Sequence, residues 1–379
     1  MSRKLLIVAG ETSGELYGSL IAKHLKNDFE LIGIGGKYMA HEGVKLIGEI
    51  THSFGALEII GQIRKIRNNM KKATSVLKEV SGLILIDFPD FNLSLAKRAK
   101  QLGKKVLYYV SPQIWAWRKG RINTIKKVVD FMATVLPFEE KIYKEAQIPA
   151  KFVGHPMVEV MEAELGDYKG RDLKSVLKDK FNIDKKTVIT LMPGSRPSEI
   201  KRKMPLMLSI IEKFPQEGTH FLIPKAPNIE FDQDTLRKIY FHGNVTILKE
   251  SSFTALAMSD VALITSGTST LQATLLQIPM VVVYKVNPVS YLIGKSIIKG
   301  VKHIAMPNVI VDFLNQGDIR VPEFIQKLNQ QKIIEEINKM IYDEEYREKI
   351  IEFLGNIKKH FDNKKPSEEV VKICKELFY

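Results

Sequence analysis

The stretch LLIVAGETSGELYGSLIAKHL, residues 5–25, opens with five apolar residues and runs through three glycines into a helical pattern. A buried strand followed by a glycine-rich turn and a helix is how a phosphate-binding α/β unit begins. The turn, however, carries Glu11 and no lysine or arginine. It also lacks a P-loop's lysine, because Gly14 is followed by Glu15 and Leu16, and its glycine spacing differs from G-x-G-x-x-G. The stretch therefore predicts an α/β fold whose first turn meets something other than a nucleotide phosphate.

The same alternation of short apolar runs and amphipathic patterns continues along the chain. Runs without alternating polarity are typical of strands covered by helices on both faces, and so of a doubly wound parallel sheet. Helices are expected at residues 14–25, 59–80 and 93–102. Strands are expected at 4–9, 30–35, 82–87, 105–110, 131–135 and 150–153, and again at 187–192, 219–224, 245–248, 261–265, 279–284 and 303–305.

The alternation therefore occurs twice, and the polar residues 162–184 separate the two halves. A chain of 379 residues also exceeds the usual size of a single core. We expect two Rossmann-like domains facing a cleft, residues 1–165 and 166–344. The helical tail 345–379 is expected to complete the first domain.

The composition limits the class of protein. A hydrophobic content of 45% and a charged content of 26% are those of a soluble globular protein. No apolar run reaches the ~18 residues of a membrane-spanning helix, and the start MSRKLLIVAG lacks a signal-peptide cleavage site. The lone Cys374 excludes an internal disulfide and a multi-cysteine zinc site, which fits a cytoplasmic protein.

The chain is basic, with a formal net charge of +14 at pH 7. Such a surface suits phosphorylated substrates or an anionic membrane, although a lysine-rich, heat-adapted proteome gives the same excess. No nucleic-acid-binding module is present in the pattern, so we expect no nucleic-acid partner.

In the second half, two small turns follow predicted strands and precede helices. Backbone N–H groups, hydroxyls and a basic side chain at a helix start are suited to a diphosphate, although each turn could also be an ordinary helix cap. A third strand end, at Leu248, would lie beside the base. The expected nucleotide-binding residues are Gly194, Ser195, Arg196, Leu248, Ser266, Gly267, Thr268, Ser269 and Gln272.

In the first half, the predicted strand 82–87 ends in IDFPDFNL. Asp87, at the strand end, is the better candidate for a general base. Asp90 and Asn92 are candidates for binding the substrate, although they could simply cap the next helix. Pro89 is expected to hold Phe88 in an extended conformation.

Two further segments of the first half combine apolar and basic residues. SPQIWAWRKGR carries Trp115, Trp117, Arg118 and Arg121, which suit a sugar, an acyl chain or a phosphate, although one tryptophan is expected in the core. Residues 57–72 form either a basic amphipathic helix for an anionic membrane or an ordinary core-facing helix.

Taken together and in this order, AGETSGE, IDFPDFNL, YYVSPQIWAWRKGR, LPFEEKIY, FVGHP, LMPGSRPSEI, SGTSTLQATL and MPNVI with VPEFIQ resemble the lipid-A-disaccharide synthases. The resemblance runs from Ala9 to about Gln326. It implies the two-Rossmann (GT-B) glycosyltransferase fold, without a metal or other cofactor. The implied reaction is inverting transfer of 2,3-diacylglucosamine from its UDP carrier to 2,3-diacylglucosamine 1-phosphate (lipid X).

The resemblance also implies roles for individual residues. Asp87 is implied as the base, with Glu11 as runner-up; Glu11 and Ser13 would meet the acceptor, and Asn308 and Glu323 would line the donor side. The enzyme would work at the anionic inner-membrane surface, and a homodimer is left open. One departure is Gln272, where the family usually has a glutamate for the ribose. The alternatives are another GT-B glycosyltransferase, a UDP-sugar epimerase, or a non-catalytic nucleotide sensor that binds membranes.

Overall fold

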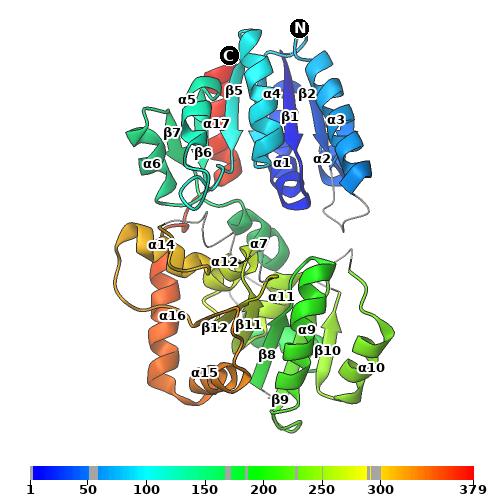
Figure 1. The fold of residues 1–379 in the computed structure, drawn as a ribbon, viewed down its shortest axis with the longest axis vertical. Coiled ribbons are helices and arrows are strands. Elements are labelled where there is room, and N and C mark those ends of the chain that lie inside the picture. The colour runs from blue at the N-terminus through cyan, green and yellow to red at the C-terminus, as the bar shows by residue number, and fades with distance from the viewer. Residues whose placement is uncertain are drawn as a thin grey trace. The chain divides into compact units, whose positions relative to one another are not determined.

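The computed structural model describes residues 3–50, 59–166, 172–183, 187–226, 229–249, 251–287, 291 and 300–379. They form two compact units (Figure 1). The first contains the described residues of Met1–Pro156, Ile297–Gly300 and Asn363–Tyr379, and the second contains those of Met157–Ser296 and Val301–Asp362. Each unit is an α/β domain built on one parallel sheet.

The sheet of the first unit has seven strands in the order β3-β2-β1-β4-β5-β6-β7, and every neighbouring pair is parallel. Strand β1 is buried from Leu5 to Ala9 because both of its faces are covered. The strands are β1 (Arg3–Ala9), β2 (Phe29–Gly35), β3 (Lys45–Glu49), β4 (Gly82–Ile86), β5 (Lys105–Tyr109), β6 (Phe131–Thr134) and β7 (Ala150–Phe152).

The helices of the first unit cover both faces of this sheet. Side chains of α3, α4 and α5 pack into one core with the strands, whereas α17, from the end of the chain, packs against α1. The helices are α1 (Thr12–Leu25), α2 (Lys37–His41), α3 (Ile59–Ser75), α4 (Pro89–Gln101), α5 (Arg121–Val128), α6 (Glu139–Glu145) and α17 (Pro366–Phe378).

The sheet of the second unit has six strands in the order β10-β9-β8-β11-β12-β13, again all parallel. Its strands are β8 (Thr187–Met192), β9 (Thr219–Pro224), β10 (Val245–Leu248), β11 (Val261–Thr265), β12 (Met280–Tyr284) and β13 (Glu323–Ile325). Its helices are α7 (Met157–Leu165), α8 (Leu173–Lys180), α9 (Pro197–Ile211), α10 (Gln233–Phe241), α11 (Ser252–Ala257), α12 (Thr268–Leu275), α14 (Met306–Leu314), α15 (Gln330–Tyr342) and α16 (Glu344–Lys358). Side chains of α9 and α15 belong to its main hydrophobic core.

The doubly wound parallel architecture is confirmed, and the structure corrects several details. Residues 303–305 are not a strand, because a side chain rather than a neighbouring strand binds their N–H groups; the sixth strand is β13, which the pattern missed, as it missed β3. The region 162–184, expected to be a linker, contains α8. Within the tail, α16 packs on α12 and α15 of the second unit, so only residues from Asn363 onward belong to the first.

Candidate functional sites in the two units

In the first unit, the candidate residues follow two neighbouring strands at the point where the strand order reverses. Strand β1 lies between β2 and β4, and Ala9 at its end pairs with Ile86 at the end of β4. Ligands of open parallel sheets bind at the carboxyl ends of strands at such a switch point. The fold therefore brings the turn of Glu11 and the turn of Asp87 to the same edge of the sheet.

The turn after β4 has an unusual backbone. Asp87 and Phe88 both have positive φ values, 46° and 44°, before α4 begins at Pro89. The expectation that Pro89 holds Phe88 extended is wrong: Phe88 is left-handed, with ψ 57°. Two consecutive left-handed residues other than glycine cost roughly 1–3 kcal/mol each, and such strain is concentrated at functional sites.

Specific contacts hold this strained turn. The carbonyl oxygen of Asp87 accepts hydrogen bonds from Asn92 Nδ2 at 2.8 Å and from the Tyr108 hydroxyl. The ring of Phe88 lies against Gly10, where a Cβ atom would come within 2.2 Å of it. Gly10 thus lets two turns pack together, which is a structural reason for a glycine that resembled part of a phosphate loop.

The Asp87 carboxyl is electrostatically perturbed. Burial, and then the charge of Glu11, raise the pKa of Asp87 from 3.8 to about 6. Glu11 and Ser13 are exposed at the start of α1, and the Glu11 side chain makes no capping hydrogen bond. A partly buried carboxylate with a pKa near neutrality is suited to general-base catalysis.

Tyr17, which the sequence analysis did not assign to the site, interacts with Asp87 and contacts a buried histidine. Tyr17 of α1 is buried, and burial and the charge of Asp87 raise its pKa. Its ring contacts the ring of His155 edge-on at 5.9 Å. Burial lowers the pKa of His155 to about 3, so this imidazole is neutral at physiological pH.

Asp90, Trp117, Arg118 and Arg121 form one cluster. Arg118 lies 4.6 Å and Arg121 5.4 Å from the Trp117 ring centroid, and both guanidinium groups bind the Asp90 carboxylate. The Asp90 side chain is 74% exposed and does not cap α4. Two arginines on an indole ring can hold a phosphate or a sugar face.

Trp115, in contrast, is a core residue. Its Nε1 donates to Glu139 Oε1 at 3.0 Å, and Glu139 also accepts bonds from the N–H groups of Val135 and Leu136. Burial raises the pKa of Glu139 to about 7. Through Trp115, Glu139 anchors the segment that also carries Trp117 and Arg118. The motif LPFEE alone did not reveal this role.

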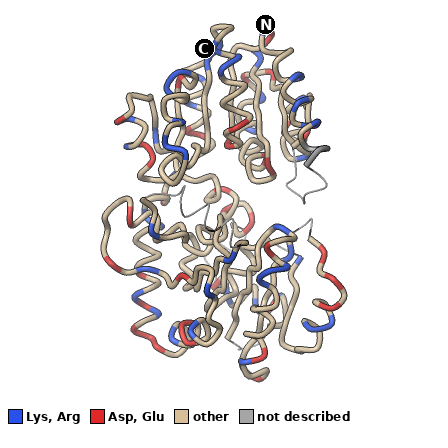
Figure 2. Tube along the Cα trace, viewed as in Figure 1, with Lys and Arg blue, Asp and Glu red and all other residues tan. Residues whose placement is uncertain are grey.

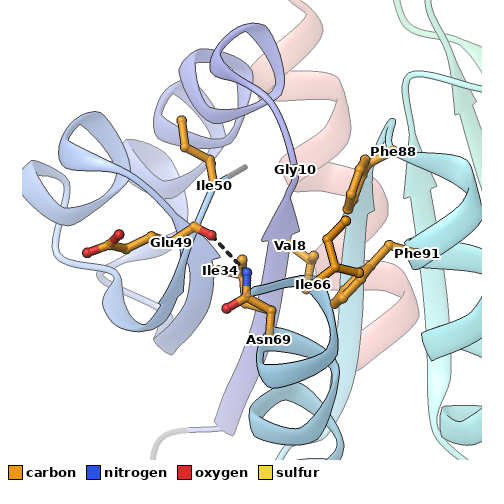
Figure 3. A pocket seen from close by; sticks show the side chains of 9 residues that line it. All are labelled: Val8, Gly10, Ile34, Glu49, Ile50, Ile66, Asn69, Phe88 and Phe91. Atoms are coloured by element: carbon orange, nitrogen blue, oxygen red, sulfur yellow. Dashed lines mark hydrogen bonds between the residues drawn. The ribbon is translucent and has the colours of Figure 1, made fainter. Parts of the chain in front are cut away.

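A small apolar pocket lies beside these turns (Figure 3). Its wall includes Phe88 and Gly10, the immediate neighbours of Asp87 and Glu11 in the chain. The other lining residues are Val8, Ile34, Glu49, Ile50, Ile66, Asn69 and Phe91. Ile66 comes from α3, so at this point the helix faces the core rather than presenting an unpartnered apolar face.

Helix α3 also carries several basic residues (Figure 2). Arg64, Arg67, Lys71 and Lys72 are exposed, together with Ile63. The segment 57–72 that we considered for membrane binding lies partly outside the described residues. In the described part of the chain, no helix is both long and apolar enough to cross a membrane.

In the second unit, the two predicted turns again follow neighbouring strands at a switch point. Strands β8 and β11 pair through Met192 and Ile264, close to their carboxyl ends. Gly194 has a φ of 119° and Gly267 a φ of 154°, conformations that favour glycine. The turn at Gly267 leads into α12, whose first turn offers backbone N–H groups without intrahelical partners.

The turn after β8 already holds a carboxylate. Glu199 Oε2 accepts the N–H of Ser195 at 3.2 Å, and Glu199 Oε1 lies 3.9 Å from Arg196 Nη1. An internal carboxylate thus occupies one N–H group of the predicted phosphate turn and lies near the guanidinium group of Arg196. The Arg196 side chain is still 56% exposed.

Asn308 and Glu323 make internal contacts in the structure. The Glu323 carboxylate accepts from the N–H groups of Ile304 and Ala305 and from Asn308 Nδ2, and burial raises its pKa. Ser266 Oγ donates to the Ile304 carbonyl at 2.9 Å. These bonds anchor the Ser266 turn, so the side chains are suited to positioning it.

The remaining nucleotide candidates are also placed at the carboxyl edge. Gln272, in α12, accepts a hydrogen bond from Ser252 Oγ at 3.0 Å. Leu248 ends β10; its side chain is buried and its carbonyl accepts the N–H of Lys225. No group of three or more His, Cys, Asp or Glu residues in the described ranges is arranged to hold a metal ion.

Solved structures with the same fold include a sugar-nucleotide epimerase and a glycosyltransferase. UDP-GlcNAc 2-epimerase from Neisseria meningitidis aligns over 98% of this chain and 100% of its own, with a TM-score of 0.66 and 15% identity. The calicheamicin glycosyltransferase CalG4 aligns over 99% and 98%, with a TM-score of 0.60 and 11% identity. The fold is therefore of the GT-B type that glycosyltransferases and epimerases share.

Sequence comparison identifies the family to which the chain belongs within this fold. The family described as lipid-A-disaccharide synthetase matches residues 5–371. Lipid-A-disaccharide synthases from Coxiella burnetii and Nitrosococcus oceani are 34% and 37% identical, over 100% and 90% of this chain and 99% and 88% of theirs. The chain belongs to the lipid-A-disaccharide synthase family and is a glycosyltransferase of lipid A biosynthesis. The epimerase alternative rests on fold alone and is not favoured.

Proposed function

We propose that this enzyme transfers 2,3-diacylglucosamine from UDP-2,3-diacylglucosamine to the 6-hydroxyl of 2,3-diacylglucosamine 1-phosphate, with inversion at the anomeric carbon. The products are the disaccharide 1-phosphate and UDP. Membership of the lipid-A-disaccharide synthase family supports the assignment of these two substrates. Among the structural observations, the Asp87 carboxyl carries the proposal, because its strained turn and its pKa of about 6 suit a base that is charged at neutral pH.

In the proposed mechanism, Asp87 takes the proton of the acceptor hydroxyl as its oxygen attacks the anomeric carbon. The bond from that carbon to the UDP oxygen breaks, and UDP leaves with the electron pair. Glu11 is the second candidate for the base. As a neighbour of Asp87, its negative charge also helps to raise the pKa of the Asp87 carboxyl. Ser13 is exposed beside Glu11 and is proposed to contact the acceptor. Asn92 is fully buried, so it supports the Asp87 turn instead of contacting the acceptor.

The cluster of Asp90, Trp117, Arg118 and Arg121 is proposed to bind the acceptor's sugar or 1-phosphate. Its two guanidinium groups supply the positive charge, and the Trp117 ring supplies an apolar face. Trp115 contributes indirectly, since it is buried against Glu139 and supports this segment.

The second unit is proposed to bind UDP. Arg196 and the turn formed by residues 266–269 would hold the diphosphate, with N–H groups and a helix N-terminus that favour negative charge. Leu248 would lie near the base and Gln272 near the ribose, while Asn308 and Glu323 hold the turn in place.

We further propose that the protein acts in the cytoplasm, peripherally bound to the inner membrane through the basic residues of α3 (Figure 2). A homodimer is compatible with this arrangement and is tested by the solution mass.

The reaction is tested by mixing protein, UDP-2,3-diacylglucosamine and lipid X in detergent and following UDP and disaccharide formation. Formation of both products supports the proposal, and no UDP release rejects it. A parallel reaction with a chelator tests the metal-free mechanism, which requires turnover to persist.

A further inference from the structure

One lysine of the second unit is buried without a direct ion pair in the described part of the chain. Lys203, on α9, is only 1% exposed. Within the described residues, its ammonium group has no hydrogen bond or ion pair; its recorded contact is with the ring of Tyr284, whose centroid lies 5.9 Å from Nζ. Burying a charge without a partner is costly, so an unpaired buried ammonium requires an explanation.

Its neighbours place this ammonium at the carboxyl edge of the sheet. Tyr284 is the last residue of β12, and the preceding residue, Val283, accepts the N–H of Ser266 at 3.2 Å. On its own helix, Lys203 comes one turn after Glu199, and helical side chains lean toward the N-terminus of their helix. Lys203 thus lies near the end of β12, on the helix that begins directly after the Gly194–Arg196 turn.

The electrostatics agree with this placement. Burial lowers the pKa of Lys203, while the Glu199 carboxylate acts in the opposite direction. That carboxylate is the one that occupies the N–H of Ser195 and neighbours Arg196. In the free protein, the Glu199 carboxylate thus interacts with the Ser195 N–H, with Arg196 and, electrostatically, with Lys203.

We infer that Lys203 is a binding residue for the diphosphate of UDP and that Glu199 stands in for a phosphate in the free protein. The inference rests on the proposed function, in which UDP binds to this unit. A cation in a low-dielectric site stabilises the charge that develops on the leaving diphosphate more strongly than one in water. Lys203 forms no covalent bond and transfers no proton in this role.

The other explanation is a lysine whose stem fills the core while its tip reaches solvent. To separate the two, UDP, UMP and uridine affinities are measured by calorimetry for wild type and for Lys203→Met, which keeps the length and removes the charge. Lys201→Met is the matched control, because Lys201 is exposed on the same helix. Thermal unfolding of each unliganded variant checks that it is folded.

We expect Lys203→Met to weaken UDP binding about tenfold to a hundredfold, as for loss of a charged hydrogen bond, and to leave uridine binding within about twofold. Lys201→Met should change UDP binding less than about twofold. An equal loss for UDP and uridine, or an unchanged ratio of the two affinities, overturns the inference. If the wild-type protein does not bind UDP, the proposed function fails as well; if it binds UDP but Lys203→Met binds equally, only this inference fails.

Discussion

Replacing Asp87 by asparagine should strongly reduce turnover and at the same time stabilise the protein. Burial and Glu11 raise the pKa of Asp87 from 3.8 to about 6, so the folded protein binds its proton more tightly than the unfolded chain. A carboxyl of this kind lowers stability as pH rises through the window from 3.8 to about 6. At 1.36 kcal/mol per pKa unit, the charged carboxyl costs the folded state about 3 kcal/mol at neutral pH.

Asparagine keeps the shape of the side chain, tolerates positive φ and carries no charge. Asp87→Asn should therefore raise the free energy of unfolding by up to about 3 kcal/mol at pH 7.5, and by little near pH 4. Urea unfolding of both proteins at several pH values measures this, since the other titrating groups cancel in the difference. Turnover should fall by roughly 10²–10⁴-fold, as for loss of a general base.

The control is Asp90→Asn, which removes an exposed carboxylate three residues away. It should lower stability slightly, by breaking surface ion pairs, with no gain at neutral pH. The reasoning is refuted if Asp87→Asn is less stable than wild type at pH 7.5, if its effect on stability does not change with pH, or if it retains turnover.

The remaining predictions concern the other proposed elements. Glu11→Gln should move the acidic limb of the kcat/KM profile against pH to lower pH and leave UDP affinity within about twofold. The shift should be smaller than the full pKa shift of Asp87, because the burial of Asp87 remains. An acidic limb at the same pH as in the wild type would show that Glu11 does not raise the Asp87 pKa. Gln272→Glu should strengthen UDP binding several-fold through a charge-assisted bond to the ribose, with the Ser252 contact kept, and unchanged calorimetric affinity would count against it. Arg64→Glu with Lys71→Glu should release the protein from anionic vesicles, at about 1 kcal/mol per lost basic residue, without affecting binding to neutral vesicles; retained sedimentation contradicts the membrane role of α3.

Local patterns were sufficient for the fold class and for most strand ends. Unalternating apolar runs appear only where both faces of a strand are covered, so the parallel sheets could be read from the sequence. Because ligands bind at the carboxyl ends of such strands, the turns at Glu11, Asp87, Gly194 and Ser266 could be selected as well. Strand β13 could not, since its three residues are only half-buried and begin with the charged Glu323, so they do not form an apolar run.

The chemistry of the site depended on contacts between distant residues. The rule for a residue before proline predicts an extended Phe88, but packing against Gly10 and bonds from Asn92 and Tyr108 to the Asp87 carbonyl favour the left-handed turn. In the sequence, Lys203 is one basic residue among several and could not be singled out; the helix face that it occupies decides its burial.

The sequence by itself thus determined the succession of strands and turns along the chain. It also determined the protein family. Both follow from apolar periodicity and motif spacing, which are local properties of the chain. Only the tertiary structure decided which carboxyl has a raised pKa, which lysine is buried and which side chains merely support others. Desolvation and charge interactions act through space, and they depend on neighbours that only the folded chain brings together.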